Sequence, residues 1–289
     1  MATIPRNLLL SSILNSILCI IFLIPSHGAH GQHPKFKRIV SLAPNLTEII
    51  LALGLEQELV GVTNFCNVPT KKTIIGGLTN PSLEAIISLR PDLVVMTTDG
   101  NPQDVAKKLE RLKIKIYVFK AKHLRELLPE ILSMGQFLGA ENQTKTLTNN
   151  IKQQLDNITP SPPDRRRRPK TLFLIWPTPI IIAGKGTFID DALDMLKLDN
   201  LSRTVNYPQY SLEEIIRQSP EIIFIGQSHS QTQANTRKIY QELLSKLRSV
   251  PAVKNHKVFF VSDTLYRLGP KIATGIEELQ RCLKNSTCQ

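Results

Sequence analysis

Apolar residues recur in two different patterns along this chain of 289 residues. Short unbroken apolar runs, typical of buried strands, alternate with longer segments in which apolar residues return every three or four positions, as on one face of a helix. Strands that alternate with helices in this way predict an α/β architecture with buried parallel sheets. The strand candidates are KRIVSLAP (37–44), LVV (93–95), IKIYVF (114–119), KTLFLIWP (170–177), IIF (222–224) and KVFFVSD (257–263).

One short pattern occurs twice: SLEAIISLRPDLVV begins at Ser82, and SLEEIIRQSPEIIFI begins at Ser211. Each copy starts with a serine, a residue suited to cap the first turn of a helix. Each then has a proline followed by an acidic residue, Asp92 or Glu221, and an apolar run. Because proline discourages further helix, each copy predicts a short helix, a tight turn and a buried strand.

The two predicted helices also place their side chains on defined faces. In the first copy Leu83, Ile86 and Ile87 follow helical spacing, and we expect them to form one apolar face. Glu84 and Glu213 lie about 100° from the neighbouring leucine, outside that face. Each copy is therefore expected to expose a carboxylate on the first turn of a helix.

The repetition extends to whole halves of the chain. In each half a strand that ends in proline precedes a helix that we expect to open with a threonine, Thr47 or Thr187. We therefore predict two similar Rossmann-like lobes, at 36–122 and 170–283, each with a central parallel sheet.

The segment between the lobes keeps helical spacing over residues 123–160. It predicts one long backbone helix, on the order of 50 Å at 1.5 Å per residue, that limits how far the lobes can rotate. Residues 161–169, with prolines and four consecutive arginines, predict an exposed connector.

The first 31 residues have the layout of a secretory signal peptide: one basic residue, an apolar stretch over 8–24 and then small and polar residues. An uncleaved anchor is the alternative, because the stretch approaches spanning length. Lipidation at Cys19 is disfavoured, since Leu18 stands where a small residue is expected. We therefore expect a cleaved, exported protein in the periplasm.

Charge and cysteines narrow the picture further. The formal net charge is +12, which fits an anionic ligand or surface, and export argues against nucleic acid as the partner. After cleavage Cys66, Cys282 and Cys288 remain, and Cys282 with Cys288 is the nearest possible disulfide, although the pairing stays open. No cysteine or histidine spacing typical of a structural metal site occurs.

The order RIVSLAPNLTEIILALG, VGVTNFCNVP and LEAIISLRPDLVV, behind a signal peptide, resembles the class III (helical-backbone) substrate-binding proteins of ABC importers. Within them the chain is most similar to the periplasmic vitamin B12 (corrinoid)-binding proteins, over residues 38–283. Binders of heme and ferric siderophores share this fold. The resemblance implies a monomer without catalytic activity or a cofactor of its own. Such a protein delivers a small molecule to a permease and ATPase complex in the inner membrane.

The resemblance also implies roles for particular residues. Glu84 and Glu213 match glutamates that meet arginines on the permease, one in each lobe. The ligand is expected between the lobes, at the carboxyl ends of the strands. The residues expected to contact it are Pro44, Asn45, Phe65, Trp176, Tyr207, Asp263, Tyr266 and Arg267.

The nature of the ligand stays open between three chemical classes. Aromatic rings suit the flat macrocycle of a corrinoid, but aromatic residues make up only 6% of the chain. Heme or a ferric siderophore is the alternative. Arg267 is then a fork for a propionate, a phosphate or a siderophore oxygen, or else simply an ion-pair partner of Asp263. Tyr207 and Tyr266 would ligate heme iron as phenolates, or else serve as half-buried packing residues.

Two interpretations from other classes have less support. An exported two-lobe α/β enzyme is disfavoured, because neither a GxSxG nucleophile elbow nor an HExxH zinc signature is found in the sequence. The other interpretation is an exported module that binds a protein partner through its basic surface.

Overall fold

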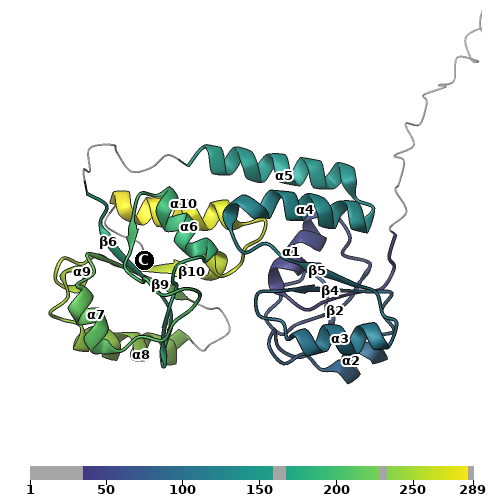
Figure 1. The fold of residues 1–289 in the computed structure, drawn as a ribbon, viewed down its shortest axis with the longest axis horizontal. Helices are drawn as coiled ribbons and strands as arrows, with labels where there is room; N and C mark the ends of the chain where they lie inside the picture. Colours follow the sequence, from purple (N-terminus) through teal and green to yellow (C-terminus); the bar gives the residue numbers. More distant parts are fainter. Residues whose placement is uncertain (1–34, 159–166, 228–232, 286–289) are drawn as a thin grey trace, which may run out of the picture. The chain divides into compact units, whose positions relative to one another are not determined.

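The computed structural model describes residues 35–158, 167–227 and 233–285 (Figure 1). The predicted signal peptide, and most of the predicted connector at 161–169, lie outside these residues. Within the described segments, we find no helix with the length and apolar character needed to cross a membrane.

The N-lobe, as we call the first α/β unit, is built on a sheet in the order β3-β2-β1-β4-β5. All four strand pairings are parallel. The strands are β1 (Ile39–Ser41), β2 (Leu59–Val62), β3 (Thr73–Ile74), β4 (Leu93–Thr97) and β5 (Ile116–Phe119).

The C-lobe has a sheet in the order β10-β9-β6-β7, with β8 paired to β6. Its pairings are parallel except for β7, which runs antiparallel to β6. The strands are β6 (Lys170–Pro177), β7 (Ile180–Ile182), β8 (Asp199–Asn200), β9 (Ile222–Gln227) and β10 (Val258–Ser262). The predicted α/β class and the six apolar strand runs are confirmed.

Helices cover both faces of each sheet (Figure 1). In the first part of the chain they are α1 (Pro44–Ala52), α2 (Leu83–Ser88), α3 (Gln103–Arg111), α4 (Leu124–Leu138) and α5 (Glu141–Asp156). Later come α6 (Phe188–Met195), α7 (Leu212–Gln218), α8 (Gln233–Lys246), α9 (Pro251–Lys254), the 3-10 helix η1 (Asp263–Tyr266) and α10 (Ile272–Asn285).

The two sequence copies occupy equivalent places in the two sheets. In the N-lobe α2 leads into β4, which pairs with β1, and in the C-lobe α7 leads into β9, which pairs with β6. The acid of each copy has the same structural task. Asp92 accepts the backbone N–H groups of Lys37 (2.7 Å) and Arg38 (2.9 Å) before β1. Glu221 accepts the N–H of Lys170 (2.9 Å) at the start of β6.

The serine caps are confirmed, because each Oγ accepts an N–H three residues later: Ser82 from Ala85 and Ser211 from Glu214, both at 3.2 Å. One helix start was predicted wrongly. α1 begins at Pro44, and Thr47 lies buried within it, where its hydroxyl donates to the Ala43 carbonyl at 3.2 Å. Proline suits a first helical position, since it has no N–H that needs a partner there.

The apolar face predicted for α2 needs a correction. Ile86 is fully buried, but Ile87 is 40% exposed. A helix of only six residues covers the sheet with a narrow stripe. Ile87, one residue beyond Ile86, therefore turns about 100° out of that stripe.

The single long helix predicted for residues 123–160 is also wrong. The chain forms α4 and α5 instead, which lie side by side and are joined at Gly139 and Ala140 (Figure 1). Gly139 takes the left-handed conformation (φ 76°) that ends α4, a position that favours glycine. The helices approach closely, because a Cβ atom added at Gly135 would lie 1.8 Å from the hydroxyl oxygen of Thr144.

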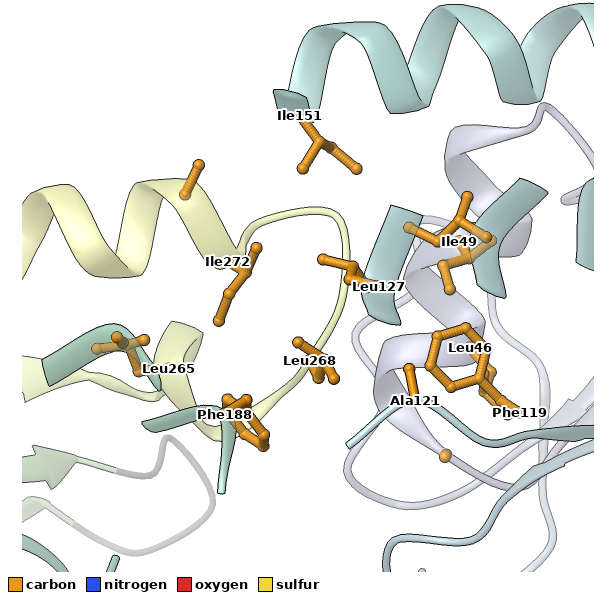
Figure 2. Close-up of a cluster of buried hydrophobic side chains, with 14 of the residues drawn as sticks. Leu46, Ile49, Phe119, Ala121, Leu127, Ile151, Phe188, Leu265, Leu268 and Ile272 are labelled. Atoms are coloured by element: carbon orange, nitrogen blue, oxygen red, sulfur yellow. The ribbon is translucent and has the colours of Figure 1, made fainter. Parts of the chain in front are cut away.

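One apolar cluster continues from the N-lobe to the C-lobe, and we call it the shared core. Figure 2 shows part of it. Side chains of α1 and α4 lie at one end, and those that follow β10 lie at the other. The side chains labelled there are Leu46, Ile49, Phe119, Ala121, Leu127, Ile151, Phe188, Leu265, Leu268 and Ile272. Because buried apolar side chains run without a break from lobe to lobe, the two lobes are packed together.

Candidate functional site

The carboxyl ends of strands in the two lobes meet at one place. Asn45, four residues after Ser41 at the end of β1, donates from its side-chain amide to the carbonyl of Leu268 at 3.2 Å. Gly269 packs on the same asparagine, and a Cβ atom there would lie 3.2 Å from that of Asn45. Leu268 and Gly269 follow β10 and η1. Pro44 and Asn45 therefore lie at the contact between lobes, where open α/β sheets bind ligands.

Arg267 connects the lobes by charge. Its guanidinium donates to Glu48 of α1 at 3.1 Å and to Asp263 of η1 at 2.9 Å. The side chains are only 22%, 14% and 14% exposed, in the order Arg267, Glu48, Asp263. Lys271 approaches Glu48 more loosely, at 3.9 Å. The donor fork predicted for a ligand anion is thus engaged by two carboxylates of the protein.

Tyr266 is half-buried, and its hydroxyl group donates to the Ile175 carbonyl at 2.8 Å. The ring lies against Gly226, where a Cβ atom would come within 2.1 Å of the tyrosine oxygen. Burial raises the pKa of Tyr266 far above its usual value. Electrostatic interaction with Tyr240 and with Asp263 raises this pKa further. In the protein without a ligand, burial therefore favours the neutral hydroxyl of Tyr266, and its ring packs against Gly226.

Asp99 of the N-lobe and Tyr207 of the C-lobe influence each other electrostatically. Asp99 follows β4, and its side chain is exposed. Desolvation by the surrounding protein nevertheless raises the pKa of its carboxyl group, and the positive charge of Lys122 opposes that shift. Tyr207 is half-buried, and desolvation first and the charge of Asp99 second raise its pKa. The negative charge of Asp99 therefore disfavours ionisation of Tyr207.

The other two aromatic candidates are open to solvent. Phe65 follows β2 and is 44% exposed, and Trp176, near the end of β6, is 37% exposed. The indole N–H of Trp176 donates to the carbonyl of Thr178 at 2.9 Å, which fixes the orientation of the ring. Large rings are mostly buried in folded proteins. These two exposed rings are therefore available for a ligand.

A free thiol, that of Cys66, follows β2 in the N-lobe. Cys66 is partly buried, and its sulfur atom lies 3.1 Å from the hydroxyl groups of both Thr47 and Thr63. Cys282 is disulfide-bonded. Cys288, the nearest partner considered from sequence, lies outside the described residues, so that pairing stays a prediction.

The two glutamates expected to dock on a permease are both exposed, on the first turns of α2 and α7. The backbone N–H of Glu213 and the Ser211 hydroxyl lower the pKa of Glu213, which keeps it ionised. No ion pair with Glu84 or Glu213 is found within the described parts of the chain.

A resident metal receives no support from the described residues, which contain no group of three or more His, Cys, Asp and Glu side chains able to hold an ion. One contact between a histidine and an aspartate joins the two lobes. His123, before α4, lies 3.1 Å from Asp191 of α6, which also accepts the N–H of Leu124 at 2.9 Å. The His123 and Asp191 side chains therefore serve to hold the start of α4 against α6 of the C-lobe.

Two α/β lobes, joined by a contact between the segments that follow β1 and η1, define the architecture of a two-lobe binding protein. Residues 39–265 match the periplasmic binding protein family, and the chain belongs to that family. Members of this family are solute-binding proteins of ABC transporters rather than enzymes.

Three comparisons illustrate this relationship. The chain is 30% identical to an uncharacterized ABC transporter substrate-binding lipoprotein of Bacillus subtilis, over 87% of this chain and 81% of that protein. It is 25% identical to a vitamin B12-binding protein of Pectobacterium atrosepticum, over 84% and 87% of the two chains. The crystal structure of a periplasmic heme-binding protein from Pseudomonas aeruginosa superposes with a TM-score of 0.75, at 22% identity, over 88% and 94%.

Sequence reasoning missed two residues of the site. Glu48 lies in the middle of an apolar helical pattern, and nothing local marks it as the partner of Arg267. Asp99 lies in a turn after β4. Its electrostatic effect on Tyr207 depends on how the two lobes pack. The one available signal was position, because Asp99 lies two residues beyond Thr97, the end of β4.

Proposed function

We propose that this protein is an exported solute receptor that captures a corrinoid between its lobes and delivers it to an ABC permease. The observation that carries the proposal is the contact between the lobes at Asn45 and Leu268. It is supported by the exposed rings of Phe65, after β2, and Trp176, near the end of β6. Exposed rings suit a broad, flat, largely apolar ligand. Similarity to substrate-binding proteins of ABC transporters supports the delivery role. It also supports a location outside the cytoplasm, which agrees with the predicted signal peptide.

The chemistry of the site favours a corrinoid over heme. A heme iron needs an axial ligand from the protein, and its propionates suit an arginine fork. Here the Tyr266 hydroxyl is bound to a carbonyl, and Arg267 is bound to two carboxylates. A cobalamin brings the axial as well as the in-plane ligands of its own metal. It therefore needs mainly ring contacts and amide hydrogen bonds, which Phe65, Trp176, Asn45 and Tyr207 can provide.

Heme and a ferric siderophore are retained as alternative cargo for the same receptor. Tyr207 is the residue that favours heme, because it is only half-buried and no hydrogen bond is assigned to its hydroxyl group within the described residues. Its raised pKa counts against a phenolate in the free protein, although a bound ferric ion lowers the pKa of an oxygen ligand.

Calorimetric titration of the mature chain, beginning at Gln32, tests the cargo. We expect cyanocobalamin to bind with a dissociation constant of 1 μM or tighter, about −8 kcal/mol. Hemin and a ferric hydroxamate siderophore are titrated in parallel. If hemin binds and cyanocobalamin does not, the receptor role survives with a different cargo. If none of the three binds, the corrinoid proposal fails.

A further inference from the structure

The two sequence copies expose one apolar residue each, in the same place. Ile87 is 40% exposed and Ile216 is 39% exposed, whereas the preceding isoleucines, Ile86 and Ile215, are fully buried. The buried member of each pair anchors its short helix on the sheet. The exposed member makes no such contribution, yet it recurs with almost the same exposure in both lobes.

Each exposed isoleucine lies beside one of the two exposed glutamates. Ile87 follows Glu84 by three residues on α2, and Ile216 follows Glu213 by three residues on α7. Residues three apart are neighbours on the surface of a helix. Each lobe therefore presents a carboxylate and an isoleucine side by side, and we call each pair a Glu-Ile pair.

Both pairs lie on sheet faces turned away from the shared core. Ile86 of α2 packs with Val40 and Met96 in an N-lobe cluster separate from that core. Ile215 of α7 packs with Leu172 and Ile223 in a separate C-lobe cluster. α4 and α10 instead cover the opposite faces as part of the shared core. The equivalent faces of the two lobes thus carry equivalent Glu-Ile pairs.

We propose that Ile87 and Ile216 are the apolar half of the permease-docking surface, each buried against the transporter beside its glutamate. This inference rests on the proposed receptor function and adds residues to it. The partner is a transporter with two equivalent subunits, each presenting a cation next to an apolar recess. The twofold repetition of the pair, with equal exposure, matches a twofold partner. The exposed carboxylates provide the charge complementarity.

The two members of a pair are expected to act on different rate constants. An exposed carboxylate steers encounter, so its removal lowers the association rate and the dependence on salt. A buried apolar contact holds the complex together, so its removal raises the dissociation rate with little change in salt dependence. This difference separates the contribution of isoleucine from that of glutamate.

The test measures binding of the full mature protein to the cognate permease–ATPase complex in lipid nanodiscs, by surface plasmon resonance at several salt concentrations. Ile87→Thr and Ile216→Thr keep a β-branched side chain but remove apolar area. We expect each to raise the Kd on the order of fivefold, through dissociation, and the pair together about 25-fold, because distant sites add. Ile87→Leu with Ile216→Leu keeps the apolar contact and should bind within about twofold of wild type.

Leu132→Thr on α4 is the matched control, since Leu132 is 43% exposed but lies on a helix of the shared core. It should leave docking unchanged. If both isoleucine variants bind like wild type while Glu84→Ala and Glu213→Ala weaken binding, the inference is wrong and the docking role of the glutamates stands. If the wild-type protein does not bind the transporter at all, the proposed function itself fails.

Discussion

Arg267 of the C-lobe donates to Glu48 of the N-lobe at 3.1 Å, so a largely buried ion pair joins the two lobes at the edge where a ligand is expected. The same guanidinium holds Asp263 at 2.9 Å. An arginine between two carboxylates is well placed to stabilise the arrangement of the lobes. It is correspondingly less available to a ligand, unless an anionic ligand displaces Glu48.

The first prediction concerns this ion pair. Arg267→Met should lower the free energy of unfolding by about 2 kcal/mol, because it leaves two carboxylates close together without their cation; the fully buried limit of 3–5 kcal/mol is discounted for partial exposure. Urea unfolding at constant pH and salt measures the change. Adding Glu48→Gln should recover part of the loss, since one of the two stranded charges is removed.

Arg203→Met is the matched control for that experiment. Arg203 pairs with Asp199 at 3.1 Å, but its side chain is 67% exposed, and exposed pairs contribute about 0–1 kcal/mol. An equal loss from both arginine variants would show that the pair with Glu48 has no special weight.

The second prediction uses the only tryptophan of the chain. Trp176 is 37% exposed at the end of β6, so all tryptophan emission reports on the candidate site. Binding of a coloured macrocycle, corrinoid or heme, should quench this emission by more than half as the ligand saturates. Free tryptophan mixed with the same ligand corrects for inner-filter absorption. Saturable binding by calorimetry without quenching would place the ligand away from Trp176.

The third prediction concerns the raised pKa of Asp99. Because this pKa lies higher in the folded state than in the unfolded state, the folded protein binds more protons between the two values. Stability should therefore fall as the pH rises through that window, which begins near 3.8, the ordinary pKa of an aspartate side chain. Asp99→Asn removes the effect, and its melting temperature should exceed that of wild type above the window and match it below. The gain is expected to be small, because Asp99 is exposed to solvent.

A matched acid gives the opposite sign. The backbone N–H of Lys122 is the largest cause that lowers the pKa of Glu126; desolvation opposes it, and the backbone N–H of His123 lowers the pKa further. Glu126→Gln should therefore lose stability at neutral pH. Melting temperatures of both variants from pH 3 to pH 8 check the two signs. A stability difference at Asp99 that does not change with pH would contradict the assignment.

Features that depend on neighbouring residues could be predicted from the sequence, and features that depend on long-range packing could not. Strands such as β4 and β9 were predictable, because an apolar run after a proline is a local signal, and so were the caps at Ser82 and Ser211. The break at Gly139 was missed, because the helical spacing continues on both sides of it. The exposure of Ile87 and the contact of Glu48 with Arg267 depend on how elements pack. No local pattern encodes that packing.

The fourth prediction tests delivery. Glu84→Ala together with Glu213→Ala should leave ligand affinity within about twofold of wild type while uptake falls to background, because the two side chains are exposed on the first turns of α2 and α7. Uptake of labelled ligand in cells that lack the wild-type protein measures the second quantity. Glu242→Ala serves as a charge-matched control on α8. Loss of ligand binding in the double variant would contradict the docking assignment.

The fifth prediction concerns the two helices that replace the expected single one. Gly135→Ala should destabilise the protein by about 2 kcal/mol, because the added methyl group would lie 1.8 Å from the Thr144 hydroxyl oxygen and α4 must move away from α5. Gln136→Ala, at the adjacent exposed position, should be neutral or slightly stabilising, since alanine favours helix. Urea unfolding of both variants measures the difference. Equal stability of the two would mean that α4 and α5 are not closely packed, and the shared core would then lose the support that α5 gives through Ile151.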